Sequence, residues 1–509
     1  MNPIGQANPS EDCLYLNVWT KGLQKGFNNL HLDEPNNKSS SKSSSSSSRN
    51  GERRDSKALK PIVFWIYGGS NVDGSTQAYV GLDNLARDED ICIFAPNYRL
   101  GVLGFLTSPA LAEADSRGTS GNYAITDLLA ALVWVHNNAK AFGCDPGSVT
   151  LYGQSSGGTN ILALMASPSA QNLFHAAISL SPSLNITQDM AAAEKAHAPL
   201  IDNTSCSGLN GSALVQCLRS VPVKELMDAV PSSWSAGLAG LRPGTDPNGL
   251  TSLTGLLAVD GVTIAKPLRA ALRQPVVDVP LLLSSMRDEE DLLPNVTVAT
   301  WTRPELDKYF NATFARYPAG TVAAMHRLFG GATFTTVPQA YYDLGSATGI
   351  NCGCISVGLD AAKGLQSPVY VAEVDLPPVN PVRMVFGALK SQYPFHAWDW
   401  VLAQQAWHFA SVTGGGVVEP GARDLAGGAL LRSAFMDLIR PPHTTKLLAQ
   451  VDSGDSTGTG TGTSYVVNVL QESGYDTKEA VWKHSPDYRQ DMCSTLLSLG
   501  FDDRFYWIN

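Results

Sequence analysis

The segment 149–158, with the sequence VTLYGQSSGG, constrains the fold of this chain more than any other. Its first half has the pattern of a short apolar strand, and residues 159–165 continue as an apolar helix. Between them lies the pattern G-x-S-x-G, in the context of a preceding strand and a following helix that it requires. Gly153 and Gly157 are small because so sharp a turn leaves no space for side chains. Such a turn would lift Ser155 above a sheet with a helix N-terminus pointing at it. The plainer interpretation is a glycine-rich turn with an incidental serine.

Apolar and amphipathic patterns along the rest of the chain predict the fold class. Continuous apolar runs predict buried strands at 61–67, 91–95, 173–180 and 279–285, and alternation predicts another strand at 14–19. An amphipathic helix is predicted at 127–142. Strands that alternate with helices indicate an α/β fold with a central, mostly parallel sheet flanked by helices.

The segments between these elements predict how the chain is organised. Residues 36–58 are dominated by serine, so we expect a disordered surface insertion within a single domain that covers residues 1–509. Residues 185–270 predict helical insertions over the carboxyl edge of the sheet. From residue 396 onward the chain is predicted to be mainly helical. A flexible stretch is expected at 453–464, and a last helix at 488–499 would end at Gly500.

Charge and composition exclude several classes of partner. The formal charge is −10, which argues against nucleic acid or an anionic membrane. No apolar run approaches the ~20 residues that a transmembrane helix needs. The chain has no P-loop, no G-x-G-x-x-G and no cluster of metal-ligand type, so no metal or other cofactor is implied.

Cysteines and glycosylation sequons indicate a secretory history. Cys206 and Cys217 lie in a polar stretch typical of a small extracellular disulfide loop. Cys352 and Cys354 are too close in sequence to bond each other easily, and their partners stay open. The N-x-S/T sequons are at Asn37, Asn185, Asn203, Asn210, Asn295 and Asn311. The first residues, MNPIGQ, show no signal peptide.

A nucleophilic serine needs a base, an acid that orients the base, and donors for an oxyanion. Residues 68–70, Gly-Gly-Ser, follow a predicted strand directly, and their N–H groups are candidate donors together with that of Ser156. The run Asp288-Glu-Glu-Asp291 follows a later strand. It could equally be four solvated acids, and the run alone does not say which one turns inward. His396 lies in a loop before a predicted helix, whereas His408 is expected inside that helix as a packed side chain.

The whole set of motifs resembles the type-B carboxylesterase/lipase family, the cholinesterase-like branch of the α/β hydrolases, and its style is similar to that of fungal members. The matching segments are SEDCLYLN at 10–17, WIYGG at 65–69, NYRLG at 97–101, GFL at 104–106, GN at 121–122, Asp127, FGCDP at 142–146, GQSSGG at 153–158, VDG at 259–261, DE at 288–289 and HAWD at 396–399.

The resemblance implies an α/β-hydrolase fold and a set of roles. Ser155 matches the nucleophile, Glu289 the acid and His396 the base. The oxyanion donors would be Gly69, Ser70 and Ser156, and Cys206 would pair with Cys217. The implied activity is that of a serine carboxylic ester hydrolase, which acts through an acyl-enzyme on a small-molecule ester, with secretion as the expected localisation.

Several positions depart from the family pattern. Ser70 stands where the family has a third oxyanion glycine, so a side chain would crowd the pocket. Gln154 replaces a glutamate, which removes a negative charge and favours an uncharged ester over a cationic one. Glu290 replaces the glycine after the acid, so Glu289 and Glu290 compete, with Glu289 preferred. The family segment before residue 10 is expected to be missing, which would leave Cys13 without its partner. Two alternatives stay open: a catalytically silent binding protein of this family, and an enzyme that transfers an acyl group to a metabolite.

Overall fold

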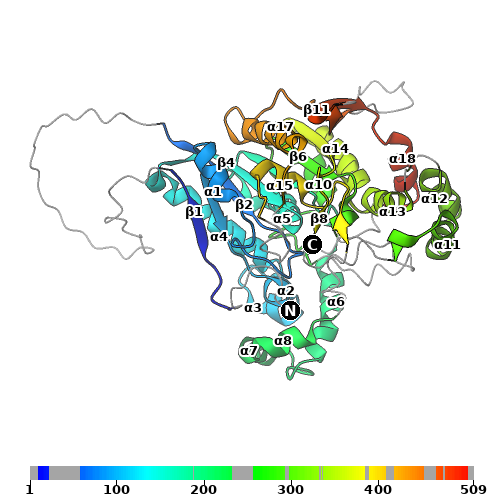
Figure 1. Ribbon diagram of the computed structural model, residues 1–509. Helices are drawn as coiled ribbons and strands as arrows, with labels where there is room; N and C mark the ends of the chain where they lie inside the picture. The colour runs from blue at the N-terminus through cyan, green and yellow to red at the C-terminus, as the bar shows by residue number, and fades with distance from the viewer. Residues whose placement is uncertain are drawn as a thin grey trace, which may run out of the picture.

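The computed structural model describes residues 10–21, 58–186, 188–231, 256–292, 297–331, 334, 336–383, 389–408, 418–451, 466–473 and 476–501. The predicted serine-rich insertion, apart from its last residue, and the predicted flexible stretch at 453–464 lie outside the described residues. Figure 1 shows a central sheet that runs across the molecule from β1 to β11, with helices on both sides of it.

A nine-stranded sheet in the order β1-β3-β2-β4-β5-β6-β7-β10-β11 organises the described chain. Only the outermost pairs, β1 with β3 and β10 with β11, are antiparallel, and the pairs between them are parallel. A separate two-stranded sheet joins β8 to β9. The strands are β1 (Leu16–Trp19), β2 (Lys60–Ile66), β3 (Cys92–Pro96), β4 (Cys144–Gln154), β5 (Ala176–Leu180), β6 (Leu281–Met286), β7 (Val369–Asp375), β8 (Val382–Arg383), β9 (Lys390–Ser391), β10 (Val466–Ser473) and β11 (Asp476–Pro486).

Helices cover both faces of this sheet, as the predicted α/β fold requires. They are α1 (Leu82–Asp88), α2 (Gly101–Phe105), α3 (Pro109–Ala114), α4 (Tyr123–Asn138), α5 (Ser156–Met165), α6 (Met190–Asp202), α7 (Gly211–Ser220), α8 (Val223–Ala229), α10 (Leu268–Arg273), α11 (Arg303–Phe314), α12 (Thr321–Phe329), α13 (Val337–Ser346), α14 (Cys352–Gly364), α15 (Trp398–Gln404), α17 (Ala422–Ile439) and α18 (Gln490–Ser498). The helices α6, α7, α8 and α10 confirm the helical character predicted for 185–270.

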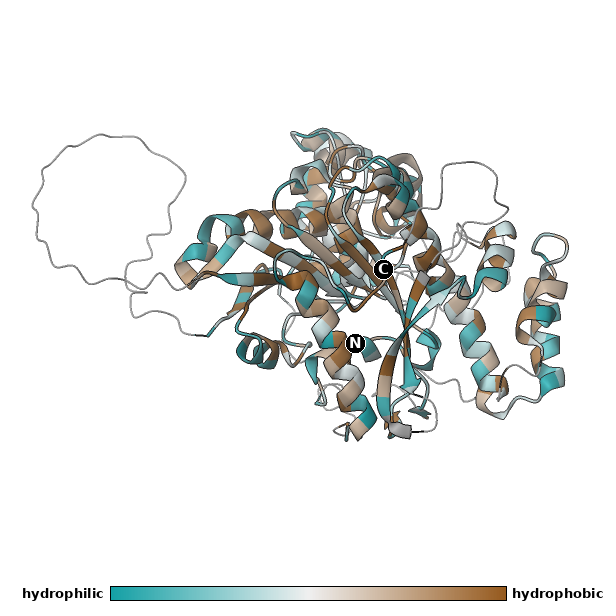
Figure 2. Ribbon diagram, turned by 90° about the horizontal axis from the view of Figure 1, so that it is seen from above, coloured by the Kyte–Doolittle hydropathy of each residue, from teal (hydrophilic) through white to brown (hydrophobic). Residues whose placement is uncertain are grey.

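The core lies on the two faces of the sheet because strand side chains alternate. Along β2, Ile62 and Phe64 pack into one buried cluster and Val63 and Trp65 into the other. The first cluster includes apolar side chains of α4, α5 and α14, and the second includes those of α15 and α17. Hydrophobic residues gather along the central strands and the helix faces that meet them (Figure 2).

The end of the chain differs from its prediction. The segment after residue 396 was expected to be mainly helical, yet β10 and β11 form one edge of the main sheet. Val467 and Val469 face one cluster while Leu470 faces the other, so the period is two. The predicted last helix is confirmed as α18, and Gly500 follows it with a left-handed φ of 77°. His408 was wrongly placed: α15 ends at Gln404, and His408 is exposed.

Three disulfides join cysteines of the described chain. Cys206 pairs with Cys217, as the family resemblance implies, whereas the pairs Cys92–Cys144 and Cys352–Cys493 were not predicted. Cys13 and Cys354 are free thiols. Disulfides are typical of oxidising compartments and are compatible with secretion.

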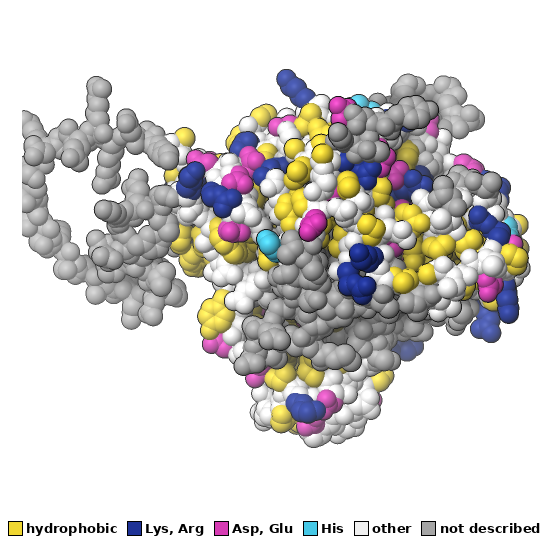
Figure 3. All heavy atoms as spheres, viewed as in Figure 1, with side chains coloured by type: hydrophobic (Ala, Val, Ile, Leu, Met, Phe, Trp, Pro, Cys, Tyr) yellow, Lys and Arg dark blue, Asp and Glu magenta, His cyan; other side chains and the backbone are white. Residues whose placement is uncertain are grey.

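On the face drawn in Figure 3, basic and acidic side chains are interspersed and do not form separate patches. Among the described residues, none of the helices combines the length and the apolar character that crossing a bilayer requires.

Use of the six sequons stays a prediction. Of these asparagines, Asn37 and Asn295 lie outside the described residues, Asn185 is half-buried, and Asn203, Asn210 and Asn311 are exposed.

Candidate active site

Ser155 occupies a strained turn between β4 and α5. Its φ of 60° and ψ of −129° are rarely adopted by residues other than glycine. A hydrogen bond helps to stabilise this strained conformation, since the Ser155 N–H donates to the carbonyl of Leu180 at 2.8 Å. A Cβ on Gly157 would lie 2.0 Å from the carbonyl oxygen of Ile66, and one on Gly153 would lie 2.7 Å from the carbonyl oxygen of Gly157. Both glycines are therefore required by backbone contacts.

His396 and Glu289 form a buried pair at the carboxyl end of β6. The Nδ1 atom of His396 lies 2.6 Å from Oε2 of Glu289, and the other carboxylate oxygen accepts the N–H of Met286 at 2.7 Å. The backbone N–H of His396 also donates to the carbonyl of Glu289, at 3.2 Å. Glu289 is 0% exposed and His396 3%. The loop of His396 leads directly into α15, as predicted.

Gln154 links the pair of His396 and Glu289 to the serine turn. Its side-chain Nε2 lies 2.9 Å from Nε2 of His396, so the histidine contacts the residue that precedes Ser155. Gly68 adjoins the same turn, because a Cβ there would lie 2.7 Å from Cβ of Ser155. The sequence-predicted residues His396 and Glu289 thus lie beside the residue that precedes Ser155, and all three candidates are at most 5% exposed although they are far apart in the chain.

The loop after β2 reaches the serine turn at Gly68 and carries backbone N–H groups beyond it. Gly69 has a φ of 124° and Ser70 a φ of 57°, so both bend the loop sharply. Within the described part of the chain, the N–H groups of Gly69, Ser70 and Ser156 have no hydrogen-bond partner, and the last of these is at the N-terminus of α5. The Gly68 N–H, by contrast, donates to the hydroxyl of Tyr79 at 3.0 Å.

A pair of buried amides fixes the position of this loop. Asn71 follows Ser70 and also has a positive φ, of 55°. Its side chain and that of Asn160, on α5, each donate to the other, at 3.3 and 2.9 Å. Because both side chains are fully buried, the exchange satisfies groups that would otherwise destabilise the fold.

The acidic run that follows β6 is buried, so the interpretation of solvated acids is wrong. Asp288 to Asp291 are all at most 5% exposed. Burial and the neighbouring Asp343 raise the pKa of Asp288 well above its ordinary value. Burial raises the pKa of Asp291 to about 7, although its carboxylate accepts the N–H groups of Gln392 and Tyr393 at 2.7 Å. Glu290 packs on Gly345, where a Cβ would lie 1.9 Å from its Oε1.

Asp399 is a second buried carboxyl beside the pair of His396 and Glu289. Its two oxygens accept hydrogen bonds from the Trp400 N–H at 2.7 Å and from the Ser284 hydroxyl at 3.1 Å. Burial, together with the nearby charge of Glu289, raises the pKa of Asp399 to about 7. The group therefore keeps a proton to higher pH than an exposed aspartate does.

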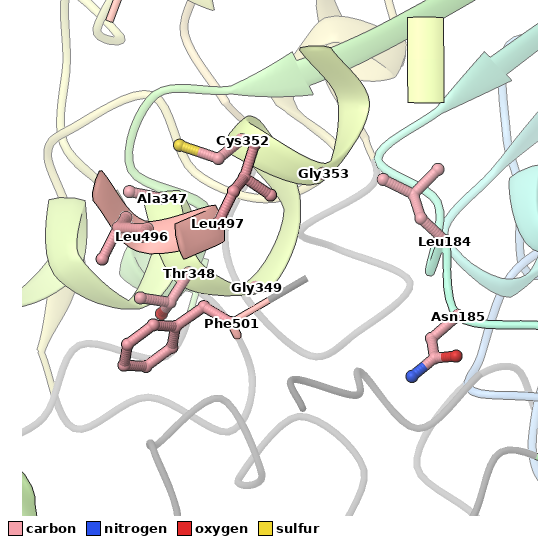
Figure 4. A pocket seen from close by; sticks show the side chains of 10 residues that line it. All are labelled: Leu184, Asn185, Ala347, Thr348, Gly349, Cys352, Gly353, Leu496, Leu497 and Phe501. Carbon is pink, nitrogen blue, oxygen red and sulfur yellow. The ribbon is translucent and has the colours of Figure 1, made fainter. Parts of the chain in front are cut away.

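A small hollow lies between the loop after β5 and the C-terminal helix. Figure 4 shows Leu184 and Asn185 on one side of it, and Cys352 and Phe501 on the other. It encloses about 20 Å³, which is room for one water molecule. This hollow is too small for an ester substrate.

The sequence of this chain matches a known protein family. The model of the carboxylesterase family matches residues 2–318 of the 509 residues. The chain belongs to the carboxylesterase family. The expected likeness to fungal members and the expected missing segment stay predictions.

Several esterases are similar in sequence to this chain. A fumonisin B1 esterase from Sphingopyxis macrogoltabida is 28% identical over 341 residues, which make up 64% of this chain and 54% of that protein. A liver carboxylesterase from Sus scrofa is 36% identical over 225 residues, or 43% of this chain and 32% of that protein. The chain thus spans about half or less of the length of these relatives.

Solved structures of other esterases show that the fold is that of an α/β hydrolase. A PNB esterase superposes with a TM-score of 0.64 at 20% identity, covering 95% of this chain and 83% of that chain. A thermophilic PNB esterase gives a TM-score of 0.65, also at 20% identity, with 96% and 84% covered. The predicted fold class is confirmed.

Sequence reasoning about this carboxylesterase-family chain missed three groups at the site. They are the hydroxyl of Tyr79, the amide pair of Asn71 and Asn160, and the carboxyl of Asp399. Each is an ordinary polar residue whose role depends on a partner far away in sequence. Only Asp399 carried a signal, because it belongs to the HAWD segment on which the family resemblance rested.

Proposed function

We propose that the protein is a serine carboxylic ester hydrolase that acts through an acyl-enzyme. The observation that carries this proposal is the buried contact of His396 with Glu289, at 2.6 Å, beside the strained turn that presents Ser155. A serine on such a turn becomes a nucleophile only when a base stands next to it, and a carboxylate orients that base. Membership of the carboxylesterase family supports the same reaction.

The reaction begins with proton transfer from Ser155. As its Oγ attacks the carbonyl carbon of the ester, Nε2 of His396 takes the hydroxyl proton. Glu289, which holds Nδ1, stabilises the charged imidazolium. The imidazolium then gives its proton to the leaving alcohol oxygen while the C–O bond breaks and the acyl group stays on Ser155. Water, activated by the same base, hydrolyses the acyl-enzyme and frees the carboxylic acid.

Backbone N–H groups would hold the oxyanion that forms at the carbonyl oxygen. Those of Gly69, Ser70 and Ser156 have no other partner in the described chain. Ser156 is part of the serine turn, and Gly69 and Ser70 directly follow Gly68, which packs on Ser155. One oxyanion donor of this kind typically contributes about 10²–10³-fold to kcat. The donor of Ser70 is a backbone group, so the replacement of glycine by serine keeps it.

The chemistry around the serine favours an uncharged ester. Gln154 is neutral and 2% exposed, and it contacts the base directly. A cationic substrate group gains most from a buried anion in contact with it, and the carboxylate of Glu289 already binds His396. We therefore propose simple uncharged carboxylic esters as the substrate class.

Ester turnover by matched serine variants tests this function. We expect the wild-type protein to hydrolyse an uncharged aryl ester, and Ser155→Ala to lose about 10⁴-fold or more in kcat. The control is Ser220→Ala, on the exposed end of α7, which should keep wild-type turnover. Equal turnover by Ser155→Ala and Ser220→Ala would reject Ser155 as the nucleophile.

A further inference from the structure

A chain of hydrogen bonds joins the loop after β2 to the base. The Gly68 N–H donates to Oη of Tyr79 at 3.0 Å, and the Tyr79 hydroxyl donates to Oε1 of Gln154 at 3.3 Å. The Nε2 group of Gln154 reaches Nε2 of His396 at 2.9 Å. Nδ1 of His396 meets Glu289 at 2.6 Å. Every link lies next to the serine turn.

The first link fixes the direction of the whole chain. A backbone N–H can only donate, so the oxygen of Tyr79 accepts from Gly68 and its one hydrogen points to Gln154. Burial raises the pKa of Tyr79 above its ordinary value, so that hydrogen is retained. The amide oxygen of Gln154 therefore faces Tyr79, and its NH₂ group faces His396.

The last links then determine the tautomer of the histidine. Because Gln154 presents a donor, Nε2 of His396 must present its lone pair, and the ring hydrogen is on Nδ1. That hydrogen is donated to Glu289, which accepts only. This neutral form carries the lone pair that takes a proton from Ser155, but in the resting arrangement that lone pair accepts from the Gln154 NH₂ group, which has to move aside first.

We propose that Tyr79 and Gln154 are positioning residues that hold His396 in its neutral, Nδ1-protonated tautomer, and that the Gln154 amide withdraws or turns over when Nε2 receives the proton of Ser155. The inference rests on the proposed function. A protonated Nε2 would face the Gln154 NH₂ group donor to donor, so the charged base and the resting amide oppose each other. A glutamate at this position, as in the family pattern, would accept from Nε2 and favour the charged base.

Charged and titratable groups around the base also affect the pH dependence of the reaction, so the experiment has to control for them. Glu289 faces it from the 3₁₀ turn after β6, Asp399 from α15 and Tyr79 from the loop that follows β2. Since burial raises the pKa of Asp399 to about 7, its own titration overlaps a physiological pH range. The experiment therefore runs in the wild-type and in the Asp399→Asn background.

The pH dependence of kcat/KM for an aryl ester tests the proposal. Gln154→Glu should move the acid limb of the profile to higher pH by about 1–3 units, because an acceptor beside Nε2 stabilises the protonated base. Tyr79→Phe should move it in the same direction by roughly half to one unit, since the amide is then free to turn its oxygen to His396. Gln171→Glu, an exposed change of the same type, should leave the limb in place.

Each outcome decides a separate claim. In one outcome the acid limb stays at its wild-type pH in both Gln154→Glu and Tyr79→Phe, and kcat/KM changes by the same factor at every pH. The two residues are then merely structural and the proposal is overturned. If Gln154→Glu does not fold, the Tyr79→Phe profile decides alone, since that change removes one oxygen atom. Wild-type turnover by Ser155→Ala in the same assay would overturn the proposed function instead, whatever the profiles show.

Discussion

Two turns of this molecule invite comparison: the serine turn, Gly153 to Gly157, and the acidic turn, Arg287 to Asp291. Each follows a parallel strand of the main sheet at its carboxyl end, and each contributes one residue to the candidate site. The serine turn is shaped by missing side chains, since a Cβ at either glycine would meet backbone atoms. The acidic turn is shaped by buried carboxyl groups, since four consecutive acids are at most 5% exposed.

The difference explains why the two turns are not equally visible in sequence. At the serine turn the constraints are local, so five residues and their flanking elements define it. At the acidic turn each carboxyl is placed by a distant partner: His396 for Glu289, and the backbone of Gln392 and Tyr393 for Asp291. Glu289 and Asp291 thus have different functions, although they are close in sequence, because each contacts a different part of the fold.

The largest expected effect comes from the serine turn. Gly157→Ala places a Cβ 2.0 Å from the carbonyl oxygen of Ile66, so the contact of α5 with β2 must open. We expect a loss of about 3 kcal/mol or more in the free energy of unfolding, together with all ester turnover. Denaturant unfolding measures the first, and an aryl-ester assay the second.

Gly147→Ala is the matched control for this glycine. Its Cβ would lie 3.2 Å from the side-chain Oδ1 of Asp145, at an exposed position where a side chain can move. The free energy of unfolding should change by less than about 0.5 kcal/mol. Equal stability of the Gly157 and Gly147 variants would contradict a serine turn held by backbone contacts.

At the acidic turn the expected effect is on the reaction. Glu289→Gln should lower kcat about 10⁴-fold, because the amide no longer stabilises the imidazolium or its tautomer. Glu290→Gln, one residue away and also buried, should lower it less than about tenfold, since its carboxyl packs on Gly345 instead. Steady-state kinetics on both variants compare the neighbours directly, and the opposite ranking would move the acid by one position.

The smallest expected effect is a change in pH-dependent stability through Asp399. Its pKa is raised from 3.8 to about 7, so the folded protein keeps this proton over a range in which the unfolded chain has lost it. The stability that this carboxyl contributes is therefore full below about pH 4 and is lost as the pH rises through 7. Asp399→Asn removes the dependence.

Unfolding of the Asp399→Asn variant and the wild type is to be measured at several pH values. Relative to the wild type, the variant should gain on the order of 1 kcal/mol in the free energy of unfolding between about pH 5 and pH 8. Glu113→Gln, at an exposed surface carboxyl on α3, is the control and should show no such gain. Parallel curves for the wild type and Asp399→Asn would mean that Asp399 does not carry a raised pKa.

Much of the fold followed from the sequence because apolar periodicity reports burial directly. The parallel strands from β2 to β6 and the helix before β4 were predicted within a few residues, as was the serine turn, whereas the buried parallel strand β7 was not predicted. The edge formed by β10 and β11 was missed, since its alternation was short and lay in a segment taken as helical. Pairings such as Cys352 with Cys493 depend on long-range folding, which spacing alone does not determine.

Covalent labelling of the wild-type chain measures directly whether Ser155 is an activated nucleophile. A fluorophosphonate reacts with a serine only when a neighbouring base activates it, and mass spectrometry locates the adduct. We expect one adduct, on Ser155, that does not form in Glu289→Gln at a comparable rate. Labelling of a different residue, or an unlabelled Ser155 in protein that hydrolyses esters, would contradict it.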